Sequence, residues 1–240
     1  MAYTTINKST DYFNTKLWTG TGSSNAITGV GFQPDWVWIK NRSAGEQHRI
    51  HDAVRGTNKS ISSDTSSSQT TTTQDVMSFD SDGFTLGTET AVNANGQNIV
   101  GWNWKANGQG SSNTDGSINT TYTSANTTSG FSISTYTGNA TTGASIGHGL
   151  GVAPAVVLVK RLNATSDWVM YHKGIGSPPK FIVLNSTAAE ASSGGIFYTT
   201  APTSSVFYVG DDGATNASGG TYVAYCFAEK QGFSKFGSYT

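Results

Sequence analysis

The sequence predicts an all-β protein made of two tandem antiparallel β-sandwiches of jelly-roll-like type. Three observations lead to this prediction. The 240 residues are rich in Gly, Ser, Thr and Asn and carry many aromatic side chains, a composition typical of strands joined by turns. Almost no segment has the apolar spacing of an amphipathic helix. The same ordered set of short segments also occurs twice, which indicates two copies of one fold.

The repeat is clearest in two segments that keep one register without a gap. They read GFQPDWVWIKNR at residues 31–42 and GVAPAVVLVKRL at residues 151–162. The match continues upstream, where FNTKLWTG at residues 13–20 aligns with FSISTYTG at residues 131–138. Agreement in both the apolar positions and the turn residues indicates duplication of a whole module.

The match also continues downstream. NANGQNIVGWNWKA at residues 93–106 aligns with NASGGTYVAYCFAE at residues 216–229. The offset between the copies drifts slowly, as small insertions in surface loops would cause. We therefore expect a first sandwich, a polar linker and a second sandwich, over residues 1–106, 107–114 and 115–240.

Each copy is expected to contain the same central strands. WVWIK at residues 36–40 and VVLVK at residues 156–160 each follow a proline, which suits a strand start because proline has no N–H to donate. Both runs are apolar at successive positions, so we expect them to be covered on both faces. NIVGWNWKA and TYVAYCFAE supply a second central strand, and FDSDGFTLG an Asp-Gly turn between two strands.

The polar segments between these strands are expected to be exposed loops and the sites of contact with a partner. The four contact segments are residues 43–47, 62–75, 163–167 and 211–219. The segment at residues 62–75, SSDTSSSQTTTTQD, is of low complexity and is expected to be mobile.

The last residues, Phe233–Thr240, resemble the start of a repeat. They would either close the second sandwich as a strand or offer an edge to a neighbouring chain. The first is favoured, since proteins usually cover an unpaired edge.

Charge and composition exclude several partners. The formal net charge is -1 with 12% charged residues, so the chain has no field to attract a polyanion, and we expect no nucleic-acid partner. No run approaches the ~20 apolar residues that span a bilayer, so we expect no membrane insertion. The N-terminus has no secretory signal pattern, which predicts a protein made and kept in the cytosol unless lysis or a particle releases it.

The single cysteine, Cys226, lies in an apolar run and is expected to be a buried side chain.

Residue types that carry catalysis or bind metal are present without a fitting pattern. His48 and His51 would face one metal only on a helix, whereas a strand points them to opposite faces. DSDG at residues 80–83, and Asp211 and Asp212 before Gly213, resemble fragments of calcium loops, but the further ligands are missing and Asp-Gly turns explain both. Most acidic residues lie in turns, and no nucleophile elbow or phosphate loop occurs. We expect no catalytic residues, no metal and no cofactor.

His148 and Trp168 are singled out among the residues that differ between the copies, because a residue that differs is not required by the shared fold. His148 aligns with Thr28, and Trp168 has no aromatic counterpart in the first copy. An exposed Trp ring could stack on a sugar. The candidate surface-contact residues are Trp168, His148, His48, His51, Asp211 and Asp212.

Several segments resemble modules in virion proteins of marine tailed bacteriophages, notably cyanophages and related podoviruses. They are GHGLGVAPAVVLVKR, the following DWVMYH and the ending TYVAYCFAEKQGFSKFGSYT, with TGVGFQPDWVWIKNRSA, SFDSDGFTLG and GWNWKANG in the first copy. The resemblance covers nearly the whole chain. It implies a β-rich structural and adhesion component of a tail fibre or other appendage, with no catalytic residues to carry over.

We therefore expect a non-enzymatic bacteriophage virion protein, part of a tail fibre or capsid fibre that attaches to the host surface and is assembled in the host cytoplasm. Its expected partners are other virion proteins, further copies in a homotrimer and a host cell-surface glycan. Three alternatives stay open: a free carbohydrate-binding lectin, a glycan-degrading enzyme and a capsid decoration protein without an adhesion role.

Overall fold

A computed structural model describes residues 4–239 and shows an all-β protein with antiparallel sheets packed together. The chain divides into two compact units. The N-terminal sandwich comprises residues 8–65 and 69–108, and the C-terminal sandwich comprises residues 109–239. Residues 4–7 and Ser66–Ser68 group with the C-terminal sandwich, although the repeat pattern assigns them to the first copy.

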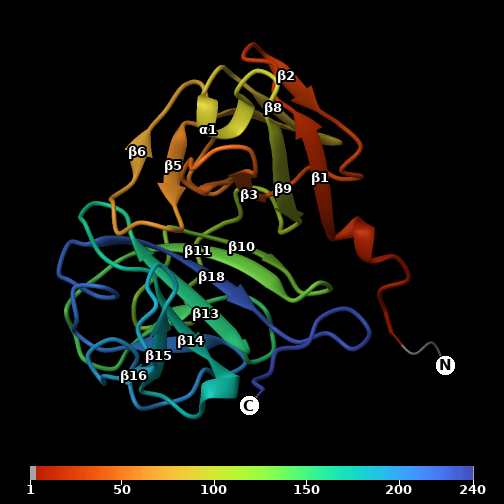
Figure 1. Ribbon diagram of the computed structural model, residues 1–240. Helices are drawn as coiled ribbons and strands as arrows, with labels where there is room; N and C mark the ends of the chain where they lie inside the picture. The colour runs from red at the N-terminus through yellow and green to blue at the C-terminus, as the bar shows by residue number, and fades with distance from the viewer. Residues whose placement is uncertain (1–3, 240) are drawn as a thin grey trace. The chain divides into compact units, whose positions relative to one another are not determined.

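The N-terminal sandwich contains a six-stranded sheet in the order β1-β9-β3-β4-β5-β6 and a three-stranded sheet in the order β2-β8-β7 (Figure 1). A short 3-10 helix (Ser9–Asp11) precedes the first strand, and the single helical turn α1 spans Thr90–Asn93. The strands are β1 (Phe13–Thr19), β2 (Asn25–Ile27), β3 (Trp36–Asn41), β4 (Arg49–Asp52), β5 (Lys59–Ser62), β6 (Thr70–Thr71), β7 (Val76–Asp80), β8 (Gly83–Leu86) and β9 (Asn98–Trp104).

The C-terminal sandwich contains a seven-stranded sheet in the order β10-β11-β18-β13-β14-β15-β16 and a two-stranded sheet of β12 and β17. A second 3-10 helix spans Lys173–Ile175. The strands are β10 (Tyr122–Asn126), β11 (Phe131–Thr137), β12 (Ala144–Gly147), β13 (Val156–Arg161), β14 (Val169–His172), β15 (Lys180–Val183), β16 (Ala191–Ser192), β17 (Val206–Val209) and β18 (Thr221–Phe227).

The two large sheets have the same strand order once β10 is set aside. The order β1-β9-β3-β4-β5-β6 corresponds strand by strand to β11-β18-β13-β14-β15-β16. The registers agree as well, because Trp36 pairs with Trp104 in the first copy and Val156 pairs with Phe227 at the aligned positions of the second. The two copies recognised in the sequence therefore have one topology, and β10 is an addition to the second.

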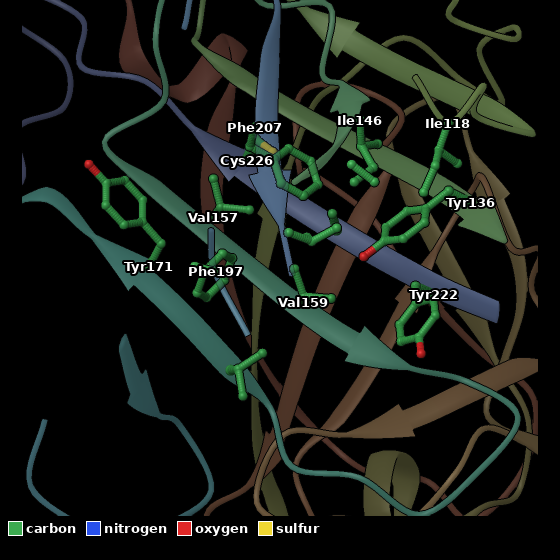
Figure 2. Packing of buried hydrophobic residues seen from close by; sticks show 14 of the residues in the cluster. Ile118, Tyr136, Ile146, Val157, Val159, Tyr171, Phe197, Phe207, Tyr222 and Cys226 are labelled. Atoms are coloured by element: carbon green, nitrogen blue, oxygen red, sulfur yellow. The ribbon is translucent and has the colours of Figure 1, made fainter. Parts of the chain in front are cut away.

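Each sandwich has its own apolar core between its two sheets. The N-terminal core gathers Val37 and Ile39 of β3 with Phe84 and Leu86 of β8. In the C-terminal core, Figure 2 shows Val157 and Val159 of β13 among a larger set of aromatic rings. Side chains on both faces of β3 and β13 are mostly buried, as their apolar runs predict. Cys226 is a fully buried member of the C-terminal core, and burial raises the pKa of its thiol to about 12.

Two predictions are wrong, the exposed mobile loop at residues 62–75 and the closing strand at the C-terminus. The segment at residues 62–75 is not a freely exposed loop, because Ser62, Ser63 and Asp75 are buried and β6 pairs with β5 within it. The C-terminal segment forms no strand over the described residues 233–239. It turns back at residues 230–234, where Lys230 and Ser234 form a bridge, and the Phe236 ring lies 6.2 Å from that of Phe227. Thr240 lies outside the described residues.

Candidate functional site

Three of the six candidate contact residues are buried, so their prediction as surface residues is wrong. Trp168, His148 and His51 have no exposed surface. Trp168 immediately precedes β14, and its ring stacks on that of Tyr225 at 6.3 Å and 19°. A large apolar ring is most stable out of water. None of the three side chains can reach a partner in this structure.

His148 holds a backbone turn between β12 and β13. Its Nδ1 accepts a hydrogen bond from the Leu150 N–H at 3.1 Å, which leaves the proton on Nε2, facing the Thr203 carbonyl at 3.2 Å. Burial lowers the pKa of His148, although the contact with Thr203 acts in the opposite direction. The imidazole therefore stays neutral and serves as a turn cap.

Replacing His148 with asparagine is expected to weaken the dependence of stability on pH. The Asn Oδ1 can replace Nδ1 as the acceptor for Leu150, but it does not titrate. In the wild type the unfolded imidazole takes up a proton near pH 6.5, and the folded one does so only at lower pH. The contribution of His148 to the free energy of unfolding is therefore complete above pH ~6.5. It is lost as the pH falls towards the folded pKa, by at most about 1.4 kcal/mol per pH unit. Urea denaturation between pH 7.5 and 5 measures the difference; parallel curves for wild type and His148→Asn would contradict this role.

The remaining candidates lie at the surface. His48 is half-buried just before β4, and its pKa is lowered mainly by burial, with Asp64 acting oppositely. Asp211 is exposed and accepts a hydrogen bond from the Thr142 hydroxyl at 3.0 Å. Asp212 caps a turn by accepting the Ala214 N–H at 2.7 Å.

The other acidic residues singled out by their sequence surroundings also have structural partners. Asp82, in the Asp-Gly hairpin turn between β7 and β8, accepts backbone N–H groups of Gly29 and Gly31 at 2.9 and 2.6 Å, which lowers its pKa. Asp35 is buried and accepts the N–H groups of Ala106 and Gly108 at 2.6 and 3.1 Å. Burial nevertheless raises the pKa of Asp35. Both carboxylates fix chain segments to one another.

The N-terminal sandwich has a buried polar centre between β4, β5 and the start of β7. His51 Nε2 lies 3.2 Å from Asp75 Oδ2, and both side chains are fully buried. His51 Nδ1 lies 3.2 Å from the Thr57 carbonyl. The Arg49 guanidinium reaches the Ser62 hydroxyl at 3.4 Å. We call Arg49, His51, Ser60, Ser62 and Asp75 the polar centre.

Electrostatics within the polar centre favour an ionised Asp75. Burial alone would raise the pKa of Asp75, but the hydrogen bond and charge of His51, the charge of Arg49 and the Ser60 hydroxyl together lower it. A His–Asp pair is the orienting half of a catalytic triad. Here the imidazole has no exposed atom and its second nitrogen faces a main-chain carbonyl, so this arrangement serves packing and orientation rather than attack on a substrate.

The polar centre is specific to the first copy. His51 pairs with Val37 in the first copy, and Tyr171 pairs with Val157 at the aligned positions of the second. The Asp75 carbonyl accepts the Gly87 N–H after β8, and the Ile196 carbonyl accepts the N–H of the aligned Gly210 after β17. All five positions are apolar in the second copy and pack in its core; the counterparts of Arg49, His51, Ser60, Ser62 and Asp75 are Val169, Tyr171, Phe181, Val183 and Ile196. The shared topology therefore does not require these charges.

Two of the candidate contact loops are held by equivalent lysines. Lys40, near the end of β3, donates from Nζ to the Glu46 carbonyl at 2.6 Å. Lys160 of β13 donates to the Ser166 carbonyl at 2.6 Å and to the Ser66 carbonyl at 3.1 Å. Lys160 is fully buried, and burial lowers its pKa to about 8. The loops at residues 43–47 and 163–167 thus have the same clamp.

Two further loops are held by equivalent buried asparagines. Asn216 donates to the carbonyls of Gly210 and Thr141 at 2.7 and 3.0 Å and accepts the Asn139 N–H at 2.9 Å. Asn93 repeats this clamp in the first copy, where it donates to the carbonyls of Gly87 and Ser23 at 2.7 and 2.6 Å and accepts the Thr21 N–H at 3.0 Å.

These loops meet at one end of each sandwich. In the C-terminal sandwich Asn163 donates to the Gly219 carbonyl at 3.3 Å, which joins the loop at 163–167 to that at 211–219. In the N-terminal sandwich the Thr90 hydroxyl donates to Glu46 at 3.4 Å and joins the corresponding loops. Each loop pair presents hydroxyl, amide and backbone groups, which suit hydrogen bonding to a polyhydroxylated ligand.

Sequence reasoning missed two parts of this arrangement. It did not select the loop at residues 88–96, although Asn93 aligns with Asn216 in the repeat. It also missed the polar centre, although the alignment sets HRIHD against WVMYH and so replaces apolar residues with charged ones. Comparing polarity between aligned positions would have found both.

Among residues 4–239 no group of three His, Cys, Asp or Glu side chains is placed to hold a metal ion. No helix in the same range is long and apolar enough to cross a membrane.

Comparison with known proteins supplies a family. No curated protein and no solved structure matches this chain. A family model described as a domain of unknown function, DUF7483, matches residues 8–240. The match covers both sandwiches, so the duplicated arrangement as a whole corresponds to the family's domain. The chain belongs to the DUF7483 family.

Proposed function

We propose that this chain is a non-enzymatic bacteriophage virion protein that forms part of an external appendage and contributes to attachment to the host surface. The observation that carries the proposal is the pair of equivalent polar loop sets, clamped by Lys40 and Asn93 in one sandwich and by Lys160 and Asn216 in the other. Clamped loops lose little conformational entropy on binding, and two copies on one chain offer two contact sites.

The titratable groups support a structural rather than a catalytic role. Asp35, His51, Asp75 and His148 are buried, and each has a backbone or side-chain partner. Such side chains stabilise a scaffold and are not placed to meet a substrate. The proposed ligand is a host cell-surface glycan, and the proposed partners are other virion proteins and further copies in a homotrimer.

A loop-replacement experiment tests the attachment role. Phage particles would carry Gly-Ser replacements of residues 163–167 and 211–214, with wild-type particles and a replacement of exposed residues 186–189 as controls. Adsorption to host cells is expected to fall at least about tenfold for the contact-loop variant, since each tenfold in affinity needs only ~1.4 kcal/mol. The control replacement is expected to adsorb normally.

The outcomes separate the alternatives. Unchanged adsorption by the contact-loop variant, with particles that lose stability, would indicate a decoration protein and contradict attachment. Glycan-array binding by the purified chain without any incorporation into particles would indicate a free lectin. Release of reducing sugar from host envelope polysaccharide would indicate an enzyme.

A further inference from the structure

The N-terminal sandwich leaves one edge of its large sheet unpaired, whereas its copy does not. Within residues 4–239, β1 pairs with β9 on one side and with no strand on the other. The equivalent strand β11 pairs with β18 on one side and with β10 on the other. The outer edge of β10 is in turn bridged by Ser111, which exchanges two backbone hydrogen bonds with Thr123. The same edge is thus covered in one copy and bare in the other.

The bare edge offers a row of main-chain donors and acceptors. In an antiparallel pair every second residue directs its backbone N–H and C=O groups to the partner strand. The Tyr12 carbonyl, just before β1, accepts the Lys105 N–H at 2.9 Å, so every second residue counted from Tyr12 faces β9. The backbone groups of Asn14, Lys16 and Trp18 therefore face β9. The backbone groups that face outward belong to Phe13, Thr15, Leu17 and Thr19.

This edge has little of the usual protection against pairing. Exposed edge strands are normally very short or carry proline, bulges or charged side chains, especially lysine. β1 has seven residues, no proline, no bulge in its register with β9 and one charge, Lys16. Its central outward residue, Leu17, is 64% exposed. An exposed leucine in the middle of an edge with a single charge favours pairing with another strand.

We propose that β1 docks against β1 of a second copy of this chain, with the two strands antiparallel about a two-fold axis at Leu17. The covered edge of β11 indicates that this position of the sheet accepts an antiparallel neighbour. In the proposed register Leu17 lies opposite Leu17 of the second copy and Thr15 opposite Thr19. Moving the two-fold axis by one residue towards the N-terminus would set Lys16 opposite Lys16 of the second copy, which like charge disfavours.

The strand is self-complementary in this register, as an interface between identical copies requires. Outward backbone groups of each β1 find partners in the other, and both Leu17 side chains leave water. A contact of one strand per chain is small, so the pairing is expected to depend on concentration. It joins chains in pairs and does not depend on the proposed attachment role.

The first test is the mass of the purified full chain. Sedimentation velocity over a range of micromolar concentrations is expected to show a reversible doubling of mass for the wild type, from one chain to two or, where the proposed homotrimer forms, from three chains to six. Leu17→Lys places two ammonium groups at the two-fold axis and is expected to weaken dimerisation at least about tenfold. Val152→Lys, at a residue that is 42% exposed in the C-terminal sandwich, is the matched control and is expected to leave the mass unchanged.

The second test fixes the register. Cys226 is buried, so Leu17→Cys introduces the one accessible thiol. Mild oxidation is expected to yield disulfide-linked dimers of Leu17→Cys and few of Thr15→Cys, which faces Thr19 of the second copy in this register. Circular dichroism would show that each variant folds.

Any of three results would overturn the pairing: a wild-type chain that stays monomeric, a trimer unaffected by Leu17→Lys, or equal cross-linking of both cysteine variants. A failure of the proposed attachment role is distinguishable from a failure of the pairing. The first is measured as the adsorption of particles with replaced loops, and the second as the mass of the purified chain.

Discussion

Replacing Asp75 by alanine is expected to lower the free energy of unfolding by about 3 kcal/mol, because it removes the buried acceptor of a hydrogen-bonded pair and leaves the donor without a partner. The His51 imidazole, 3.2 Å from Asp75 Oδ2, would lose its acceptor at a fully buried position. Arg49 would lose a nearby counter-charge as well. Urea denaturation at pH 7 measures the loss. Asp211→Ala removes an exposed carboxylate and, as the control, is expected to change stability by less than about 0.5 kcal/mol.

Exchanging the whole polar centre is expected to cost far less than removing one member. The exchange is Arg49→Val, His51→Tyr, Ser60→Phe, Ser62→Val and Asp75→Ile, which copies the apolar set of the second sandwich. Replacing a buried ionic set by packed apolar residues is often neutral or stabilising, so we expect stability within about 2 kcal/mol of wild type or above it. A fivefold variant as unstable as Asp75→Ala would show that the first copy does require these charges.

Replacing Asn216 by alanine is the second large effect, expected at about 2–3 kcal/mol, because it removes a fully buried amide that hydrogen-bonds three main-chain groups, one of which, the Gly210 carbonyl, is itself buried. These are the carbonyls of Gly210 and Thr141 and the N–H of Asn139. Asn93→Ala is expected to have a similar cost, since it makes the equivalent bonds in the first copy.

The control for the asparagine clamp is Asn163→Ala. Asn163 is exposed and also bonds to loop backbone, but water can replace it, so its loss is expected to cost less than about 1 kcal/mol. Hydrogen exchange would show whether the amides of residues 211–219 lose protection in Asn216→Ala. A cost near that of Asn163→Ala, with protection retained, would contradict the role of the clamp.

The main strands were predictable because their sequence patterns are local. The prolines before β3 and β13, the apolar runs of β9 and β18 and the Asp-Gly turn between β7 and β8 each identify an element without tertiary information. The repeat adds that both copies must satisfy one topology, which the matching strand orders confirm. The apolar surroundings of Cys226 likewise predicted its burial correctly.

The positions of single side chains were less predictable. Trp168 and His148 were selected because they differ between the copies, but such a difference is equally compatible with a buried position. In a strand, alternate residues face opposite sides, and the sequence does not say which sides are covered. The burial of Asp75 within a Ser- and Thr-rich segment also depends on His51, which lies 24 residues earlier.

The order of strands at sheet edges could not be read from the sequence. Comparison of the two sheets shows that β10 lies beside β11, whereas no strand of the described residues lies at the corresponding edge of β1.

Immunogold electron microscopy of intact phage particles is the most direct test of the proposed role. Antibodies against the purified chain, with antibodies against an internal capsid protein as the negative control, would be applied without disrupting the particles. The proposal predicts gold particles on an external appendage of the tail or capsid. Label that appears only after disruption, or none on purified particles that infect normally, would contradict it.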